Sequence, residues 1–305
     1  IAIGTQAMDS GSIGAQTGTI AIGAQALGAL TTGEGNVAIG FEALDANQTS
    51  DYNTVVGYQS GTNLTSTTAN SGNTLIGYQS GLTASSGFDY NVALGYKALY
   101  TNNNSANTAI GYLAGEDLTG NNNVFIGKEA GKEAADVDKC VIIGSNAALG
   151  VLASGADGTI AIGYDSLGDL VSGGGNVAIG TDAAKLLTTG ALNTVVGHQA
   201  FDAADRGESG NIAIGAYALG ALKEGTGGGD SDNNIAIGYN ALLGGDFTSN
   251  ARNLAGNIAI GANALTSTST NAHTGTIAIG HDALTACTTG AGNLAIGYGA
   301  MKEHV

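Results

Sequence analysis

The stretch Asn36-Val-Ala-Ile-Gly-Phe-Glu-Ala43 contains the unit that decides the fold. Its Val-Ala-Ile-Gly core is one of 17 copies of a four-residue motif that ends in glycine, with variants such as Thr-Val-Val-Gly at 54–57, Ile-Ala-Ile-Gly at 212–215 and Leu-Ala-Ile-Gly at 294–297. The intervals between successive motif glycines range from 16 to 23 residues. A repeat of this length is too short for a pair of helices and is typical of one coil of a solenoid.

The columns around the motif glycine are nearly invariant. One residue before the glycine, all 17 positions hold Ile, Val or Leu, and two residues before it, 12 hold Ala. Three residues after it, 14 hold Ala and three hold Ser. Short β-branched runs bounded by Asn and Gly predict strands, and glycine supplies the turn that follows each strand.

Four residues before the glycine, Asn occupies 12 of the 16 available positions. Stacked coils place like residues over like, about 4.8 Å apart. Side-chain amides in such a column can bond from coil to coil, so we predict an Asn ladder. Its members are Asn36, Asn53, Asn73, Asn91, Asn107, Asn123, Asn176, Asn193, Asn211, Asn234, Asn257 and Asn293.

Both faces of each predicted strand are apolar, and one of them is mostly Ala. Strands that are apolar on both faces imply that something covers the outside. A column of small residues would let another backbone approach closely, so we expect the alanine column at an interface between copies of the chain. The candidate interface residues are Ala38, Ala93, Ala109, Ala178, Ala213, Ala236 and Ala259.

The motif Asn-x-Ala-Ile-Gly-x-x-Ala resembles the head repeats of trimeric autotransporter adhesins, which are left-handed parallel β-rolls assembled as trimers. The versions with Tyr after Gly, at 76–81 and 110–115, resemble repeats in phage tail-fibre shafts. The seven such residues are Tyr58, Tyr78, Tyr96, Tyr112, Tyr164, Tyr239 and Tyr298. The tyrosine column could serve glycans, or it could pack along the fibre surface or between copies.

We therefore predict an all-β fold, a parallel β-solenoid of the β-roll or left-handed β-helix type with about 17 coils. Residues 1–305 would form one continuous repeat domain, a segment of a longer fibre protein. The trimer number comes from the resemblance, which implies a homotrimeric fibre. The resemblance also implies an extracellular location, on a virion fibre or a bacterial cell surface.

Composition and charge limit the classes of partner and ligand that we expect for this chain. The chain holds 25 acidic against 9 basic residues, a net charge of −16, which disfavours nucleic acid because phosphates would be repelled. No apolar run approaches 18 residues, so we expect no membrane insertion by this segment. No cofactor or metal motif is recognised, and two cysteines are too few for a disulfide framework.

Two function classes are weighed. The first is a non-enzymatic structural and attachment fibre, either a phage tail-fibre shaft that contributes to host-surface attachment or, alternatively, an adhesin head. The second, more remote, is a β-helix acyltransferase using His198 or His281 as general base. Only one hexapeptide per coil matches those enzymes, and the repeat columns are uniform, so the fibre is favoured.

Recognition on a rigid scaffold usually falls on loops, and two consecutive 23-residue intervals carry the longest loops, 220–233 and 243–256. They define a candidate contact patch for a host-surface glycan or protein. The patch consists of Lys223, Glu224, Asp230, Asp232, Asp246, Phe247 and Arg252. The alternative is that these loops are tolerated insertions, because loop length costs little entropy.

Overall fold

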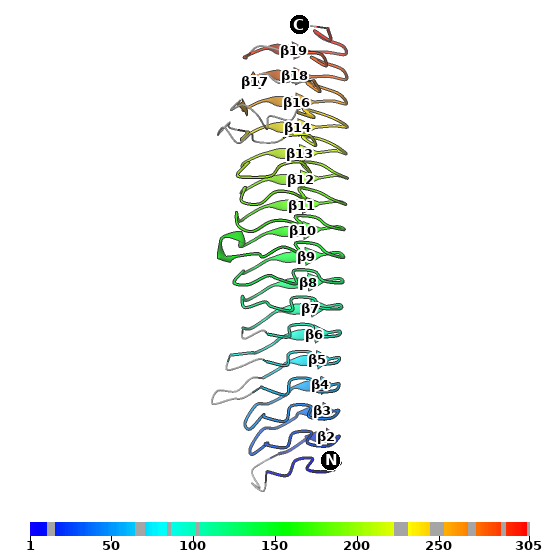
Figure 1. Ribbon diagram of the computed structural model, residues 1–305, viewed down its shortest axis with the longest axis vertical. Helices are drawn as coiled ribbons and strands as arrows, with labels where there is room; N and C mark the ends of the chain where they lie inside the picture. The colour runs from blue at the N-terminus through cyan, green and yellow to red at the C-terminus, as the bar shows by residue number, and fades with distance from the viewer. Residues whose placement is uncertain are drawn as a thin grey trace. The chain divides into compact units, whose positions relative to one another are not determined.

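The computed structural model describes residues 1–10, 16–64, 71–83, 87–101, 104–222, 231–244, 253–267, 273–287 and 291–303. The chain divides into two compact units, Ile1–Ser154 and Gly155–Val305. In each unit, short parallel strands stack one above the next (Figure 1). Within the described residues, a 3-10 turn at Ser154–Ala156 is the only helical element, and no helix has the length and apolarity to cross a membrane. The predicted all-β parallel β-solenoid is confirmed, whereas one continuous domain over 1–305 stays a prediction.

The strands coincide with the predicted motifs. In the first unit they are β1 (Ala2–Ile3), β2 (Ile20–Ile22), β3 (Val37–Ile39), β4 (Thr54–Val56), β5 (Thr74–Ile76), β6 (Val92–Leu94), β7 (Thr108–Ile110), β8 (Val124–Ile126) and β9 (Val141–Ile143). In the second unit they are β10 (Ile160–Ile162), β11 (Val177–Ile179), β12 (Thr194–Val196), β13 (Ile212–Ile214), β14 (Ile235–Ile237), β16 (Ile258–Ile260), β18 (Ile277–Ile279) and β19 (Leu294–Ile296). A second short ladder joins β15 (Leu254–Ala255) to β17 (His273–Thr274).

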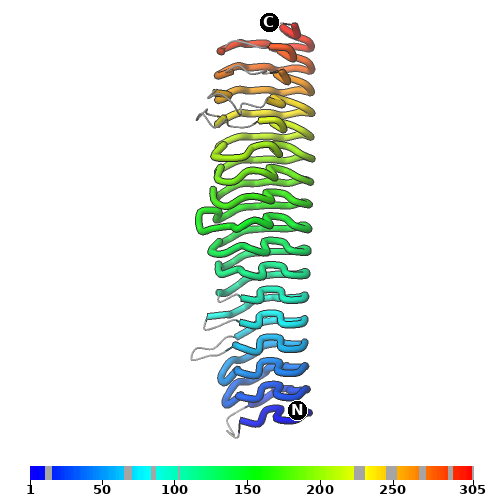
Figure 2. Tube along the Cα trace, viewed as in Figure 1, coloured from blue at the N-terminus to red at the C-terminus, as the bar shows by residue number. Residues whose placement is uncertain are grey.

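The register pairs equivalent motif positions. Ala38 lies opposite Val55, for example, and Ala178 lies opposite Val195. The backbone ladder continues past the strand ends, since Glu42 N donates to Ala24 O at 2.9 Å. Each coil then doubles back close to its own strand, as the Cα trace of either unit shows (Figure 2). The interior of a coil is therefore narrow.

The alanine column lies inside this narrow interior. All seven candidate interface alanines, Ala38, Ala93, Ala109, Ala178, Ala213, Ala236 and Ala259, have no exposed surface in the single chain. The expectation that they face another copy is wrong, because these side chains are already fully buried within the single chain. The outward positions are instead those one and three residues before each motif glycine, which are half-buried or exposed in every strand from β2 to β19 of the main ladders.

The interior is filled by residues of reciprocal size. The residue two before the motif glycine faces the residue four after a motif glycine, which is a buried Leu in many coils, such as Leu44 and Leu99. Where the first residue is large, the second is often glycine. A Cβ on Gly81 would lie 3.0 Å from Leu75 Cδ1, and one on Gly131 would lie 2.7 Å from Phe125 Cε2. At these two coils a large side chain in one column is therefore matched by a glycine in the other, as close packing of the interior requires.

This reciprocity predicts a compensating pair of substitutions. Phe125→Ala should lower the free energy of unfolding by about 3–5 kcal/mol, because a fully buried ring is replaced by a cavity. Adding Gly131→Leu should recover a large part of that loss, since Leu occupies the equivalent position, with the same left-handed backbone, at Leu44 and Leu99. Gly131→Leu alone should destabilise by overpacking. Urea unfolding of the four proteins measures the coupling, and additive effects would refute the reciprocity.

Candidate functional site

The outer surface of the strands forms an aliphatic face, defined as the side chains one and three residues before each motif glycine. In β3 these are Ile39 and Val37, and in β6 they are Leu94 and Val92. Ile39 is 37% exposed and Leu94 is 44% exposed. Each face position holds Ile, Val, Leu or Thr, and none holds a charge. Large exposed apolar patches are typical of interaction sites in proteins, so this face is a candidate site.

The Asn ladder lies at the edge of the strands. Asn193 shows the full pattern, since its N and Nδ2 both donate to Asn176 Oδ1 at 3.0 Å, and Nδ2 also donates to Glu208 O at 2.8 Å. Asn193 Oδ1 in turn accepts from Asn211 N at 2.9 Å. The same donation from each coil to the preceding one runs from Asn36 to Asn123 and from Asn176 to Asn257. Asn293 follows Thr276 and lies beyond these runs, with Nδ2 3.9 Å from Cys287 Sγ.

A second side-chain ladder lies two residues before the Asn ladder and was missed in the sequence. Ser71 N donates to Asp89 Oδ1 at 2.7 Å, and Asp89 N donates to Ser105 Oγ at 3.2 Å. Ser105 N then donates to Asn121 Oδ1 at 3.0 Å. Here the side chain of each coil accepts from the preceding coil, opposite to the direction of the Asn ladder. The residues at this position share a short side chain with an acceptor oxygen. Because Asp, Ser and Asn all meet this requirement, the position does not stand out as a column in the sequence.

An aromatic column follows the motif glycines of the first unit. It is defined as Phe41, Tyr58, Tyr78, Tyr96 and Tyr112. Consecutive rings stack with centroids 5.0–5.5 Å apart and interplanar angles of 6–17°. All five side chains are partly exposed, and Lys97 Nζ lies 5.9 Å from the Tyr96 ring centroid. Stacked aromatic pairs add to stability beyond the area they bury.

The equivalent column of the second unit is interrupted by Thr181, Ala216 and Ala262. His198 lies edge-on to Tyr217, with centroids 5.5 Å apart. His281 stacks on Tyr298, and its Nδ1 lies 3.4 Å from Asp282 Oδ1. Asp282 also accepts from Lys302 Nζ at 2.7 Å and from Asn263 Nδ2 at 3.1 Å, so the Lys302 hydrogen bond, followed by that from Asn263, lowers the pKa of the Asp282 carboxyl.

Most of the predicted contact patch lies outside the described residues, namely Lys223, Glu224, Asp230, Asp246, Phe247 and Arg252. The exception is Asp232, whose Oδ1 accepts from Ser209 N at 2.6 Å. Asp232 therefore belongs to the second side-chain ladder. The patch as a whole stays a prediction.

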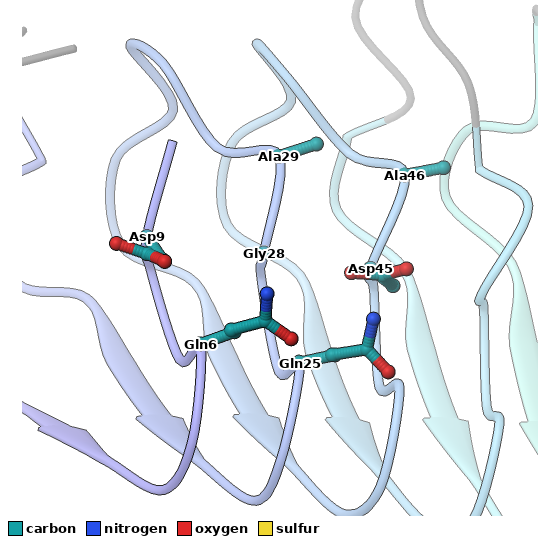
Figure 3. A pocket seen from close by; sticks show the side chains of 7 residues that line it. All are labelled: Gln6, Asp9, Gln25, Gly28, Ala29, Asp45 and Ala46. Atoms are coloured by element: carbon teal, nitrogen blue, oxygen red, sulfur yellow. The ribbon is translucent and has the colours of Figure 1, made fainter. Parts of the chain in front are cut away.

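A shallow polar groove of about 270 Å³ lies near the start of the first unit. Gln6 and Gln25 line it side by side, and Gly28 separates the Asp9 and Asp45 side chains (Figure 3). Burial, with a contribution from nearby Glu42, raises the pKa of the Asp45 carboxyl. No group of three or more His, Cys, Asp or Glu side chains suited to a metal ion occurs in the described part of the chain.

Comparison with protein families, curated proteins and solved structures found no match to this chain. The features of this chain that bear on its function are therefore the aliphatic face, the ladders and the aromatic column.

Proposed function

We propose that this chain is a structural segment of a fibre, in which copies of the chain associate through the aliphatic face. The observation that supports this is the uninterrupted run of outward Ile, Val, Leu and Thr side chains along the strands of each unit. Water-exposed apolar area of this extent favours association by the hydrophobic effect. In this proposal each of the 17 motifs forms one coil of a homotrimer.

A second copy is the partner whose shape fits the face. The outward side chains recur once per coil, so a partner can bury all of them only if it has the same axial repeat. A copy of the chain in parallel register has that repeat. The net charge of −16 does not oppose the contact, because the charged residues lie outside the three-residue strands and can stay in water.

A fibre of this kind would space or present attachment sites at a virion or bacterial surface. Repetition of the same ladders in coil after coil suits a rigid spacer, since each coil supports its neighbours. We favour a phage tail-fibre shaft that contributes to host attachment, with an adhesin head as the alternative. A β-helix acyltransferase remains a remote alternative, for which His281 beside Asp282 is the geometry to test.

Charged substitutions on the aliphatic face test the proposal. Ile39→Glu combined with Ile76→Glu should convert the oligomer to a monomer in sedimentation velocity, because the carboxylates would be buried without partners. Both side chains are 37% exposed in the single chain, so circular dichroism should be unchanged.

Val151→Glu is the matched control, because Val151 is 52% exposed but lies outside the strands. It should leave the oligomer intact. A wild-type protein that sediments as a monomer, or a double variant that stays oligomeric, would count against the proposed association.

A further inference from the structure

The polar groove near the start of the first unit opens where a side chain is missing at Gly28. Gly28 lies between Asp9 and Asp45 in the column five residues after the motif glycines (Figure 3). Gln6 and Gln25 lie side by side in the column two residues after the motif glycines. The Asp45 carboxylate leans over Gly28, since a Cβ there would clash with Asp45 Oδ1. The groove is therefore a space between two carboxylates with two amides beside it.

The same two columns hold an ammonium group in the second unit. Lys185, five residues after a motif glycine, places Nζ 3.0 Å from Asp165 Oδ2 and 3.2 Å from Asp182 Oδ1. Both carboxylates lie two residues after the motif glycines of successive coils. Lys302 repeats the contact from the equivalent position, where Nζ donates to Asp282 Oδ2 at 2.7 Å. The fold thus places the charged end of an alkyl chain beside side chains of the second column.

In the groove, the lysine of this arrangement is absent. Gly28 occupies its position in the repeat, and Gln6 and Gln25 occupy the positions of its two carboxylate partners. The amide oxygens of the two glutamines can accept from an ammonium group as carboxylate oxygens do. Asp9 and Asp45 lie one coil before and one coil after Gly28, about 10 Å apart along the coil axis, and supply the negative charge.

The chain itself brings no basic side chain to this region. No Lys or Arg precedes Lys97 in the sequence, whereas Asp9, Glu42 and Asp45 all lie in the first three coils. Burial, followed by nearby Glu42, raises the pKa of the Asp45 carboxyl. A negative charge at Asp45 is therefore costly in the free chain, and a bound cation would offset that cost.

We propose that this groove binds a primary alkylammonium group, with the ammonium beside Gln6 and Gln25 and the alkyl chain over Gly28. Such a ligand takes the place that the Lys185 side chain fills in the second unit. An ammonium group fits better than a metal ion, because the described residues hold no group of three or more His, Cys, Asp or Glu suited to a metal. The site lies within one chain, so it does not depend on the association of copies proposed above.

Titration of the full chain with 1,5-diaminopentane, followed by saturation-transfer difference NMR, tests the proposal. We expect saturable binding that Asp9→Asn and Asp45→Asn each weaken by about three- to fivefold, because one charged partner is lost. Asp169→Asn is the matched control, since it removes one carboxylate at an exposed position of the second unit and should leave binding unchanged.

Gly28→Lys should abolish binding, because the chain's own ammonium would then fill the groove. Gly28 does not have a positive φ, so its backbone accepts a side chain once Asp45 turns aside. Circular dichroism checks that the variant is folded. If it is not, the two Asn variants decide the question.

Further ligands separate the alternatives. The bis-quaternary analogue of the diamine, in which every N–H is replaced by a methyl group, should bind several-fold more weakly because it cannot donate hydrogen bonds. Tighter binding of the diamine than of Nα-acetyl-lysine methylamide would identify a free polyamine as the ligand, and the reverse would identify a lysine side chain of a partner. The absence of saturable binding, equal binding of the quaternary analogue, or an equal loss in Asp169→Asn would overturn the proposal.

Discussion

Gly180→Ala is expected to lower the free energy of unfolding by about 3 kcal/mol or more, since a strained backbone and a clash act together. Gly180 has φ +140°, a conformation that residues with a Cβ rarely adopt. A Cβ there would lie 2.7 Å from the carbonyl carbon of Gly197 in the next coil, and closer still to its oxygen. The coils cannot separate to make room without breaking the strand ladder between β11 and β12.

Gly158→Asn is the matched control within the same unit. Gly158 has φ +69°, and a Cβ there would meet nothing within 4 Å. Asn tolerates this left-handed conformation and occupies the equivalent position at Asn233, so the cost should stay under about 1 kcal/mol. Chemical unfolding followed by circular dichroism compares the two. An equal loss in the free energy of unfolding for the two variants would mean that the fold does not require close contact between motif glycines of successive coils.

Asn193→Asp should destabilise the chain by several kcal/mol at neutral pH, because it buries a negative charge and replaces the Nδ2 donor with an oxygen that has no donor to accept from. Asn193 is 1% exposed, and its Nδ2 donates to Asn176 Oδ1 and Glu208 O. A carboxylate oxygen in place of Nδ2 would face two acceptors. Asn193→Thr should cost much less, because Thr occupies the same column at Thr159 and Thr276.

The loss in free energy of unfolding caused by Asn193→Asp should increase as the pH rises. Burial would raise the pKa of the new carboxyl above its unfolded value of about 3.9. Below that pH both states are protonated and the penalty is smallest. It should grow by about 1.4 kcal/mol per pH unit above the unfolded pKa, until the folded-state pKa is passed. Unfolding measured from pH 3 to pH 7 checks this, and a pH-independent difference from wild type would contradict it.

The strands and the Asn ladder could be predicted because their columns are nearly constant. An apolar residue before every motif glycine and Asn four before most of them leave little choice of register. Which face of each strand points into the coil could not be predicted from those columns alone, since both faces are apolar. The deciding pattern was the reciprocal size of Leu75 with Gly81 and of Phe125 with Gly131, which links positions on opposite sides of one coil.

The candidate site was predictable only in part. The tyrosine column could be predicted from the sequence, but the parallel stacking of its rings could not. Neighbouring aromatic rings can also meet edge-on, as Tyr217 and Tyr239 do. The second side-chain ladder could not be predicted, because Ser71, Asp89 and Ser105 do not share a residue type and polar residues of this kind are common at any protein surface. Their common role depends on backbone N–H groups that only the coil geometry brings within reach.

The central claim, association of copies through the aliphatic face, can be tested by a spin label on that face. Leu94→Cys places the label at a position that is 44% exposed in the single chain. The native cysteines are first replaced by residues found in their own columns, as Cys140→Thr and Cys287→Ala. The electron paramagnetic resonance spectrum should show spin–spin broadening between copies, which disappears when labelled chains are refolded with an excess of unlabelled ones. A narrow, dilution-independent spectrum at position 94, like that expected for a label at Val151→Cys, would contradict association through this face.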